Sequence, residues 1–182
     1  MKQNILIDTA NIETILDSIS GVFDEQDNIY YFNHNSIDNI ENTKLYNKNT
    51  FNYFSIYNKN IYNILIKIKA MLKTMCIEND INMDKNMYYI TSEYFDNVDM
   101  LFWYDSGGDR PLSFSGYIIL DCENNATMSI DNETFNIEKG TLILSKASSK
   151  TIFNNLTTGI NFNIAPISML DGQYKQKWIP IA

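Results

Sequence analysis

The chain has 182 residues, of which 45% are hydrophobic and 13% aromatic, so it can bury a sizeable core and is not an intrinsically disordered chain. Its 22 acidic and 14 basic residues give a net charge of −8. This charge disfavours binding to nucleic acid or to an anionic membrane, because both need basic patches. We therefore expect one folded domain, 1–182, with other proteins as its partners.

The N-terminal part, 1–86, is predicted to hold the helices. Lys2–Ile7 is a candidate short strand, and Asp8 or Thr9 can then cap a helix that runs to about Ser20. A second short strand is expected at Asn28–Phe32, followed by an ordered surface excursion over 33–53. In the predicted helix, Ile12, Ile15, Leu16 and Ile19 fall at helical spacing and are expected to face the core.

The clearest helix is predicted at Asn60–Glu78, because large apolar residues recur there at a spacing of three or four. We expect this stripe to pack on the core. Its members are Ile61, Ile64, Leu65, Ile68, Leu72 and Met75.

From Met87 onward the pattern changes to short strands separated by turn residues such as Gly107-Gly108 and Asn124-Asn125. About eight such strands indicate a sandwich or jelly roll over 87–168, and the preceding helices make the fold α+β. The predicted strands are Met87–Phe95, Val98–Tyr104, Ser113–Cys122, Ala126–Ile130, Thr134–Ile137, Thr141–Ser145, Thr151–Asn154 and Ile160–Ala165.

The tail, 169–182, ends in an apolar cluster formed by Trp178, Ile179 and Ile181 with Pro180. Such a cluster either docks on its own domain or binds another chain. Tryptophan is enriched at interface hot spots, so we assign these three residues to an interface with a partner protein.

Several segments resemble the catalytic core of the 2-oxoglutarate/Fe(II)-dependent oxygenases, in the phage-type branch of that superfamily. The similar segments are Phe102–Tyr104, the loop Asp105–Pro111, Phe114–Leu120, Gly140–Leu144 and Thr158–Ile164. The resemblance implies a double-stranded β-helix (jelly roll) of about eight strands, with N-terminal helices packed on one sheet.

The residues that carry the chemistry of that superfamily are missing. Its iron site needs two histidines and a carboxylate, whereas the one histidine of this chain is His34, outside the resemblance. The distal histidine position falls near Lys150 or Thr151, and the arginine that would pair with 2-oxoglutarate falls near Thr157. We therefore expect no iron, no cofactor and no catalytic residue.

Other sites are weakly indicated at best. Asp105 and Asp109 are hard oxygen ligands for Mg²⁺ or Ca²⁺, but aspartates beside Gly-Gly are also ordinary turn residues. No nucleophile motif, phosphate-binding loop or C-x-x-C pair occurs, and Cys76 and Cys122 are expected to be reduced and buried.

The sequence thus predicts a non-catalytic structural or assembly protein. Its phage-like resemblance and AT-rich residue usage favour a virion component, from a tailed-phage neck, tail or baseplate. We expect it in the virion or the host cytoplasm, because its first residues do not form a signal peptide. The alternatives are a divergent oxygenase or other metal-dependent enzyme, and a carbohydrate-binding jelly roll.

Overall fold

The computed structural model describes residues 5–12, 29–31, 45–47, 52–55, 59–83, 87–97, 101–102, 113–147, 150–155, 157–166, 168 and 178–181. Its elements are β1 (Ile5–Thr9), β2 (Ile29–Tyr31), β3 (Leu45–Asn47), the 3₁₀ turn η3 (Tyr53–Ser55), α2 (Lys59–Glu78), β4 (Tyr88–Asn97), β5 (Leu101–Phe102), β6 (Phe114–Cys122), β7 (Thr127–Ile130), β8 (Glu133–Asn136), β9 (Thr141–Lys146), β10 (Thr151–Asn154), β11 (Thr157–Pro166) and β12 (Ile179–Pro180).

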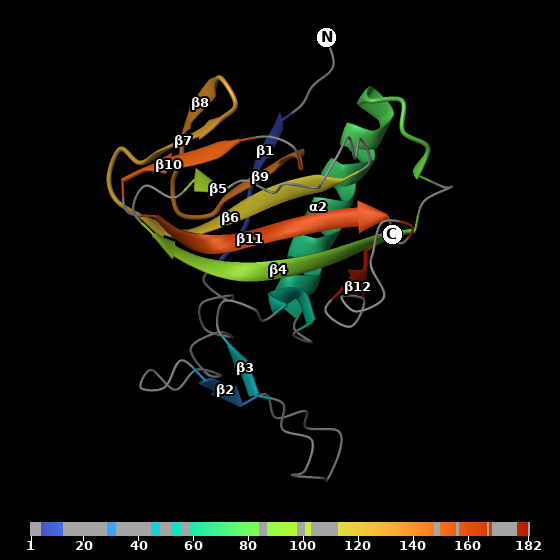
Figure 1. Ribbon diagram of the computed structural model, residues 1–182, viewed down its shortest axis with the longest axis horizontal. Coiled ribbons are helices and arrows are strands. Elements are labelled where there is room, and N and C mark those ends of the chain that lie inside the picture. The colour runs from blue at the N-terminus through green and yellow to red at the C-terminus, as the bar shows by residue number, and fades with distance from the viewer. Residues whose placement is uncertain are drawn as a thin grey trace.

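Two antiparallel sheets form the body of the protein (Figure 1). The larger sheet has the order β1-β9-β6-β11-β4-β12, and the smaller has the order β5-β10-β7-β8. Between β4 and β11 the chain passes from the larger sheet to the smaller and back three times. This alternation and strand order define a double-stranded β-helix, or jelly roll. The predicted α+β fold class is confirmed.

All eight predicted strands are present, with small differences in their bounds. Strand β11 is longer than expected because Thr157 already pairs with Asn97 of β4 and Cys122 of β6. The strand predicted at Val98–Tyr104 is described only at β5, and the rest of it lies outside the described residues.

The N-terminal part differs more. Asp8 and Thr9 were predicted to cap a helix, but both lie in β1, which pairs with β9. They do not cap a helix there, because a cap stands directly before the first helical turn and residues 10–12 are not helical. The rest of the predicted helix, 13–20, lies outside the described residues, so α2 is the one α-helix that the structure describes.

Helix α2 lies against the outer face of the larger sheet (Figure 1). Ile61, Ile64, Ile68, Leu72 and Met75 are buried there, as predicted. Leu65 was expected in the same buried stripe, but it is only partly buried, because it lies at the margin of the contact. We call the apolar layer between α2 and the larger sheet the outer core, and both elements contribute side chains to it.

The C-terminus of α2 is closed by a Schellman motif. Asp80 adopts a positive φ of 59°. Its N–H donates to Ile77 O at 3.3 Å, and the N–H of Ile81 donates to Cys76 O at 2.8 Å. Ile81 then packs on the outer core. The apolar contact fixes where the chain leaves the helix and turns toward β4.

A small residue in β6 lets an aromatic ring approach the sheet closely. A Cβ on Gly116 would lie 2.2 Å from Phe162 Cζ and 2.4 Å from Ile143 O. The ring of Phe162 therefore lies over Gly116, and Phe54 packs against it edge-on at 5.8 Å between centroids. The glycine of the Ser115-Gly116 pair serves packing in the outer core.

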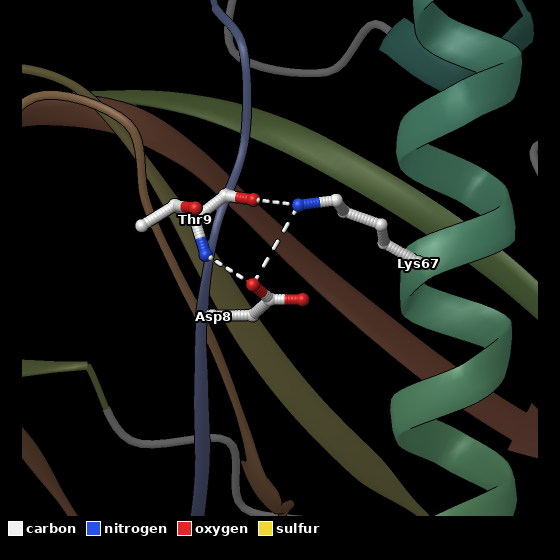
Figure 2. A network of polar contacts seen from close by, with 3 residues as sticks. All are labelled: Asp8, Thr9 and Lys67. Atoms are coloured by element: carbon white, nitrogen blue, oxygen red, sulfur yellow. Dashed lines mark hydrogen bonds and ion pairs between the residues drawn. The ribbon is translucent and has the colours of Figure 1, made fainter.

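The edge strand β1 is tied to α2 by a polar cluster (Figure 2). The Thr9 N–H donates to Asp8 Oδ1 at 2.7 Å, and Lys67 Nζ donates to Thr9 O. Lys67 Nζ also lies 3.6 Å from Asp8 Oδ1. Since Ala10 N–H pairs with Gly140 O of the neighbouring chain segment, the groups of Thr9 face away from the sheet. Asp8 and Lys67 therefore cover part of an open sheet edge.

No helix in the part of the chain that the structure describes is long and apolar enough to cross a membrane.

Candidate functional site

The space between the two sheets is where a jelly roll can hold a ligand, and one half of it is filled by aromatic rings. Phe95 and Phe153 stack at 5.2 Å between centroids. Tyr117 meets Phe153 edge-on at 5.3 Å and Phe95 at 6.2 Å. These rings come from β4, β6 and β10, and residues such as Met128 and Ile143 pack around them. We call this layer the inner core.

The other half of the same space is lined by neutral polar side chains. Asn161 of β11 lies directly opposite Tyr117 of β6, and Asn163 lies opposite Ser115, so these side chains share one face of the larger sheet. Asn161 Nδ2 donates to Gly116 O at 3.2 Å, and Asn163 Nδ2 donates to Asn161 Oδ1 at 3.5 Å. We call these four residues the polar track.

Two buried acceptors at this site have no hydrogen-bond partner among the described residues. They are Asn163 Oδ1 and Thr151 Oγ1. Most buried polar groups are paired with protein or with ordered water. The two atoms are therefore acceptors whose hydrogen-bonding capacity is not used by the described residues.

Tyr117 joins the aromatic half to the polar half. Burial raises the pKa of Tyr117 to about 12, and the neighbouring Thr151 hydroxyl lowers it slightly. The two hydroxyl groups are close enough to influence ionisation, although their geometry falls short of a hydrogen bond. Tyr117 is therefore a neutral phenol at physiological pH, suited to hydrogen bonding and not to base catalysis.

The resemblance implies a distal ligand position near Lys150 or Thr151, and these two residues differ in burial. Lys150 is exposed, and its backbone N–H donates to Asp131 Oδ1 at 2.8 Å. Thr151 is fully buried and begins β10, where it pairs with Phe102 at the end of β5. Thr151 is thus the inward-facing residue at this position.

Thr157, near which the resemblance implies the arginine that pairs with 2-oxoglutarate, lies on a different strand from Thr151. Thr151 begins β10, whereas Thr157 follows the end of that strand and donates to Asn155 O at 3.3 Å. The residue of β11 beside Tyr117 is Asn161. The sequence analysis missed the inward direction of Asn161 and Asn163, which the alternation Asn-Phe-Asn around buried Phe162 signals.

These residues do not fit the iron site of an oxygenase. Iron of that type needs imidazole and carboxylate ligands, and Thr151, where the resemblance implies the distal ligand, carries a neutral hydroxyl. No group of three potential His, Cys, Asp or Glu ligands occurs within the described ranges. His34, Asp105 and Asp109 lie outside those ranges, so the structure does not place them.

The two cysteines are free thiols in different layers. Cys76 of α2 is buried in the outer core, as expected, whereas Cys122 at the end of β6 is only partly buried, which corrects the prediction for it. Burial raises the pKa of both thiols. The carboxylates of Asp121 and Glu138 raise the pKa of Cys122 further.

The described part of the C-terminal tail, 178–181, docks on its own domain. Ile179 pairs with Ile90 of β4, and the Ile181 N–H donates to Tyr88 O at 2.9 Å. Both isoleucines pack on the outer core, while Trp178 is half-buried. The intramolecular alternative therefore holds for the isoleucines, and an interface role for Trp178 stays a prediction.

No protein-family model matches the chain, and no curated protein matches it. Among solved structures, it is distantly similar to the non-heme alpha-ketoglutarate-dependent carbocyclase SnoK from nogalamycin biosynthesis, with 7% identity and a TM-score of 0.48 over 90% of this chain and 79% of that one.

A protein from Planctomyces limnophilus aligns with 15% identity and a TM-score of 0.35 over 47% of this chain and 68% of that one. A salicylate 1,2-dioxygenase mutant from Pseudoaminobacter salicylatoxidans aligns with 6% identity and a TM-score of 0.35, over 82% of this chain but only 45% of the dioxygenase. The fold assignment rests on the strand order and not on these distant similarities.

Proposed function

We propose that the protein is a non-catalytic binding and assembly protein built on an oxygenase-like jelly roll. The observation that supports this most is the lining between the sheets. Thr151, one of the two residues at which the resemblance implies an iron ligand, is a buried neutral hydroxyl. The rings of Phe95, Tyr117 and Phe153 pack together beside it. Folds host many functions, so an oxygenase-like fold alone carries no activity.

The more specific proposal is a virion component from a tailed-phage neck, tail or baseplate. Jelly rolls are common structural modules of viruses, and the phage-type sequence resemblance favours the same setting. The partners would be other protein subunits of the particle. A mass-spectrometric inventory of native particles tests this: finding the chain at fixed stoichiometry supports a virion role, and its absence from purified particles contradicts it.

Trp178 is the residue we propose for a contact with a partner subunit. Its two neighbours Ile179 and Ile181 hold the tail on β4 and the outer core, so the half-buried indole is presented at a fixed place. We expect Trp178→Ala to weaken binding to the partner while the melting temperature hardly changes.

Ile181→Ala is the matched variant, because it removes a side chain that packs on the outer core. It should lower the melting temperature, and partner binding should persist at temperatures where the variant is folded. If Trp178→Ala instead leaves the assembly intact, the interface role of the tail is wrong.

A second candidate function, binding of a neutral carbohydrate, is favoured by the polar track. Amide and hydroxyl groups suit uncharged hydroxyl groups, and Asn163 Oδ1 and Thr151 Oγ1 offer acceptors. Calorimetric titration with neutral oligosaccharides tests this. Binding that Asn163→Ala abolishes and Asn154→Ala, on the exposed face of β10, preserves would support a carbohydrate site over a purely structural protein.

A further inference from the structure

The face of α2 that points away from the sheet carries a line of basic and apolar side chains, which we call the α2 stripe. It consists of Lys59, Tyr62, Ile66, Lys69, Lys73 and Ile77. Neighbours in this line are three or four residues apart, so they lie on one side of the helix. All six are exposed, and Tyr62, Ile66 and Ile77 keep 63%, 50% and 66% of their surface in contact with solvent.

The stripe is basic although the protein is acidic. Four of the five charged residues in α2 are lysines, on a chain whose net charge is −8. Lys67 is engaged with Asp8 and Thr9 (Figure 2). The three lysines of the stripe make no ion pair with the part of the chain that the structure describes. The stripe therefore presents unneutralised positive charge beside large apolar side chains.

The opposite side of the protein carries the complementary charge. The smaller sheet lies across the larger sheet from α2 (Figure 1), and its edge is the β7–β8 hairpin. Five exposed acids surround this hairpin and outnumber the two exposed lysines there, Lys139 and Lys150. We call them the hairpin acids, namely Asp121, Glu123, Asp131, Glu133 and Glu138.

The distance between the lysines along α2 is similar to the distance between the acids along β8. Ten residues separate Lys59 from Lys69, which is about 15 Å along a helix. Strand β8 has four residues and spans about 13 Å, with Glu133 at its start and Glu138 just beyond its end. Glu133 and Glu138 can therefore face the two ends of the stripe at Lys59 and Lys69. Tyr62 and Ile66 then lie between the two charged contacts.

We infer that the α2 stripe of one copy docks on the β7–β8 hairpin of a second copy, so that copies of this chain associate head to tail. The inference rests on the proposed assembly function and names its partner as the chain itself. In a pair of copies, one copy uses its α2 stripe and the other uses its β7–β8 hairpin. The hairpin of the first copy and the stripe of the second therefore stay free to bind further copies. Such heterologous contacts extend into a ring or a filament.

The contact is expected to be weak in dilute solution. A 20-residue helix is about 30 Å long and about 10 Å wide, so the stripe covers roughly 300 Å², against about 800 Å² per partner in a stable complex. Exposed charges are screened at high salt. Association should therefore grow with protein concentration and fall as salt is added.

Sedimentation velocity of the full chain, from micromolar to millimolar concentration and at low and high salt, tests the inference. We expect larger species at high concentration and low salt. Lys69→Glu with Lys73→Glu should abolish them. The matched pair Lys139→Glu with Lys150→Glu changes the net charge equally but lies beside the hairpin acids, so it should preserve or strengthen association. Ile66→Gln, which changes no charge, should also weaken it.

A charge exchange makes the test specific. Glu123→Lys with Glu133→Lys should abolish self-association, and mixing this chain with the Lys69→Glu, Lys73→Glu chain should restore large species. A wild-type chain that stays monomeric throughout, or a Lys69→Glu, Lys73→Glu chain that associates like the wild type, would overturn the inference. The proposed assembly function has its own test in the Trp178 variants, so the two can fail separately.

Discussion

The outer and inner cores face opposite sides of the same sheet, and they are built differently. The outer core is apolar along the whole of α2, from Ile61 to Met75. The inner core is apolar at one end only, where Phe95, Tyr117 and Phe153 meet, and becomes polar at Asn161 and Asn163. A layer that only stabilises the fold has no need of these part-buried amides, so we expect any binding function at the polar end of the inner layer.

The largest expected effect is the loss of an aromatic ring from the inner core. Phe153→Ala removes the side chain that contacts both Phe95 and Tyr117, and we expect a loss of about 3–5 kcal/mol in the free energy of unfolding. Ile152→Ala is the control, because Ile152 lies on the other face of β10 and is only partly buried. Urea titration measures both. Equal losses would mean that the aromatic cluster is not a core.

The outer core offers the next test, on two leucines of one helix. Leu72 is fully buried, so Leu72→Ala should cost about 2–5 kcal/mol. Leu65 is only partly buried, and Leu65→Ala should cost clearly less, because fewer contacts and a smaller cavity are involved. Chemical unfolding of the two variants compares them directly. A larger loss for Leu65 would contradict the placement of α2 on the sheet.

Alkaline pH should weaken the inner core through Tyr117. Its pKa of about 12 lies above the ordinary value of 10, so the folded state keeps a proton that the unfolded state releases. The contribution of Tyr117 to the free energy of unfolding is therefore complete below pH 10 and is lost between pH 10 and about 12. A shift of two pKa units corresponds to a loss of up to ~2.7 kcal/mol. Tyr117→Phe should flatten this decline in unfolding free energy, whereas Tyr62→Phe on the exposed face of α2 should not.

The smallest effect concerns the reactivity of the two thiols. Cys122 is partly exposed and Cys76 is buried, so a thiol reagent at mildly alkaline pH should modify Cys122 first. Removing a nearby carboxylate lowers the pKa of Cys122, and Glu138→Gln should therefore speed its reaction. Glu133→Gln makes the same charge change farther along the hairpin and should act less. A faster reaction at Cys76 would contradict the burial of α2.

The outer core was largely predictable because its signals are local. The spacing of Ile61, Ile64, Ile68 and Leu72 fixed a helix and its buried face, and turn residues fixed the strands. The exposure of Leu65 was not predictable, because it depends on how far the sheet extends beneath the helix.

The inner layer was less predictable because its residues meet only across strands. The sequence could not tell which of Lys150 and Thr151 is buried, since that depends on which side chain points inward. Asn161 becomes a neighbour of Tyr117 only through the pairing of β11 with β6. That pairing joins residues 44 positions apart, since 161 − 117 = 44, and no local pattern reports it.

An anaerobic titration of the purified full-length protein with Fe(II) and 2-oxoglutarate tests whether this jelly roll works as an oxygenase. Because the resemblance implies no histidine ligand in this chain, we expect no charge-transfer band on adding both reagents and no succinate after oxygen is admitted. Stoichiometric iron bound with micromolar affinity, together with succinate formation, would contradict the proposal that the protein is a non-catalytic assembly component.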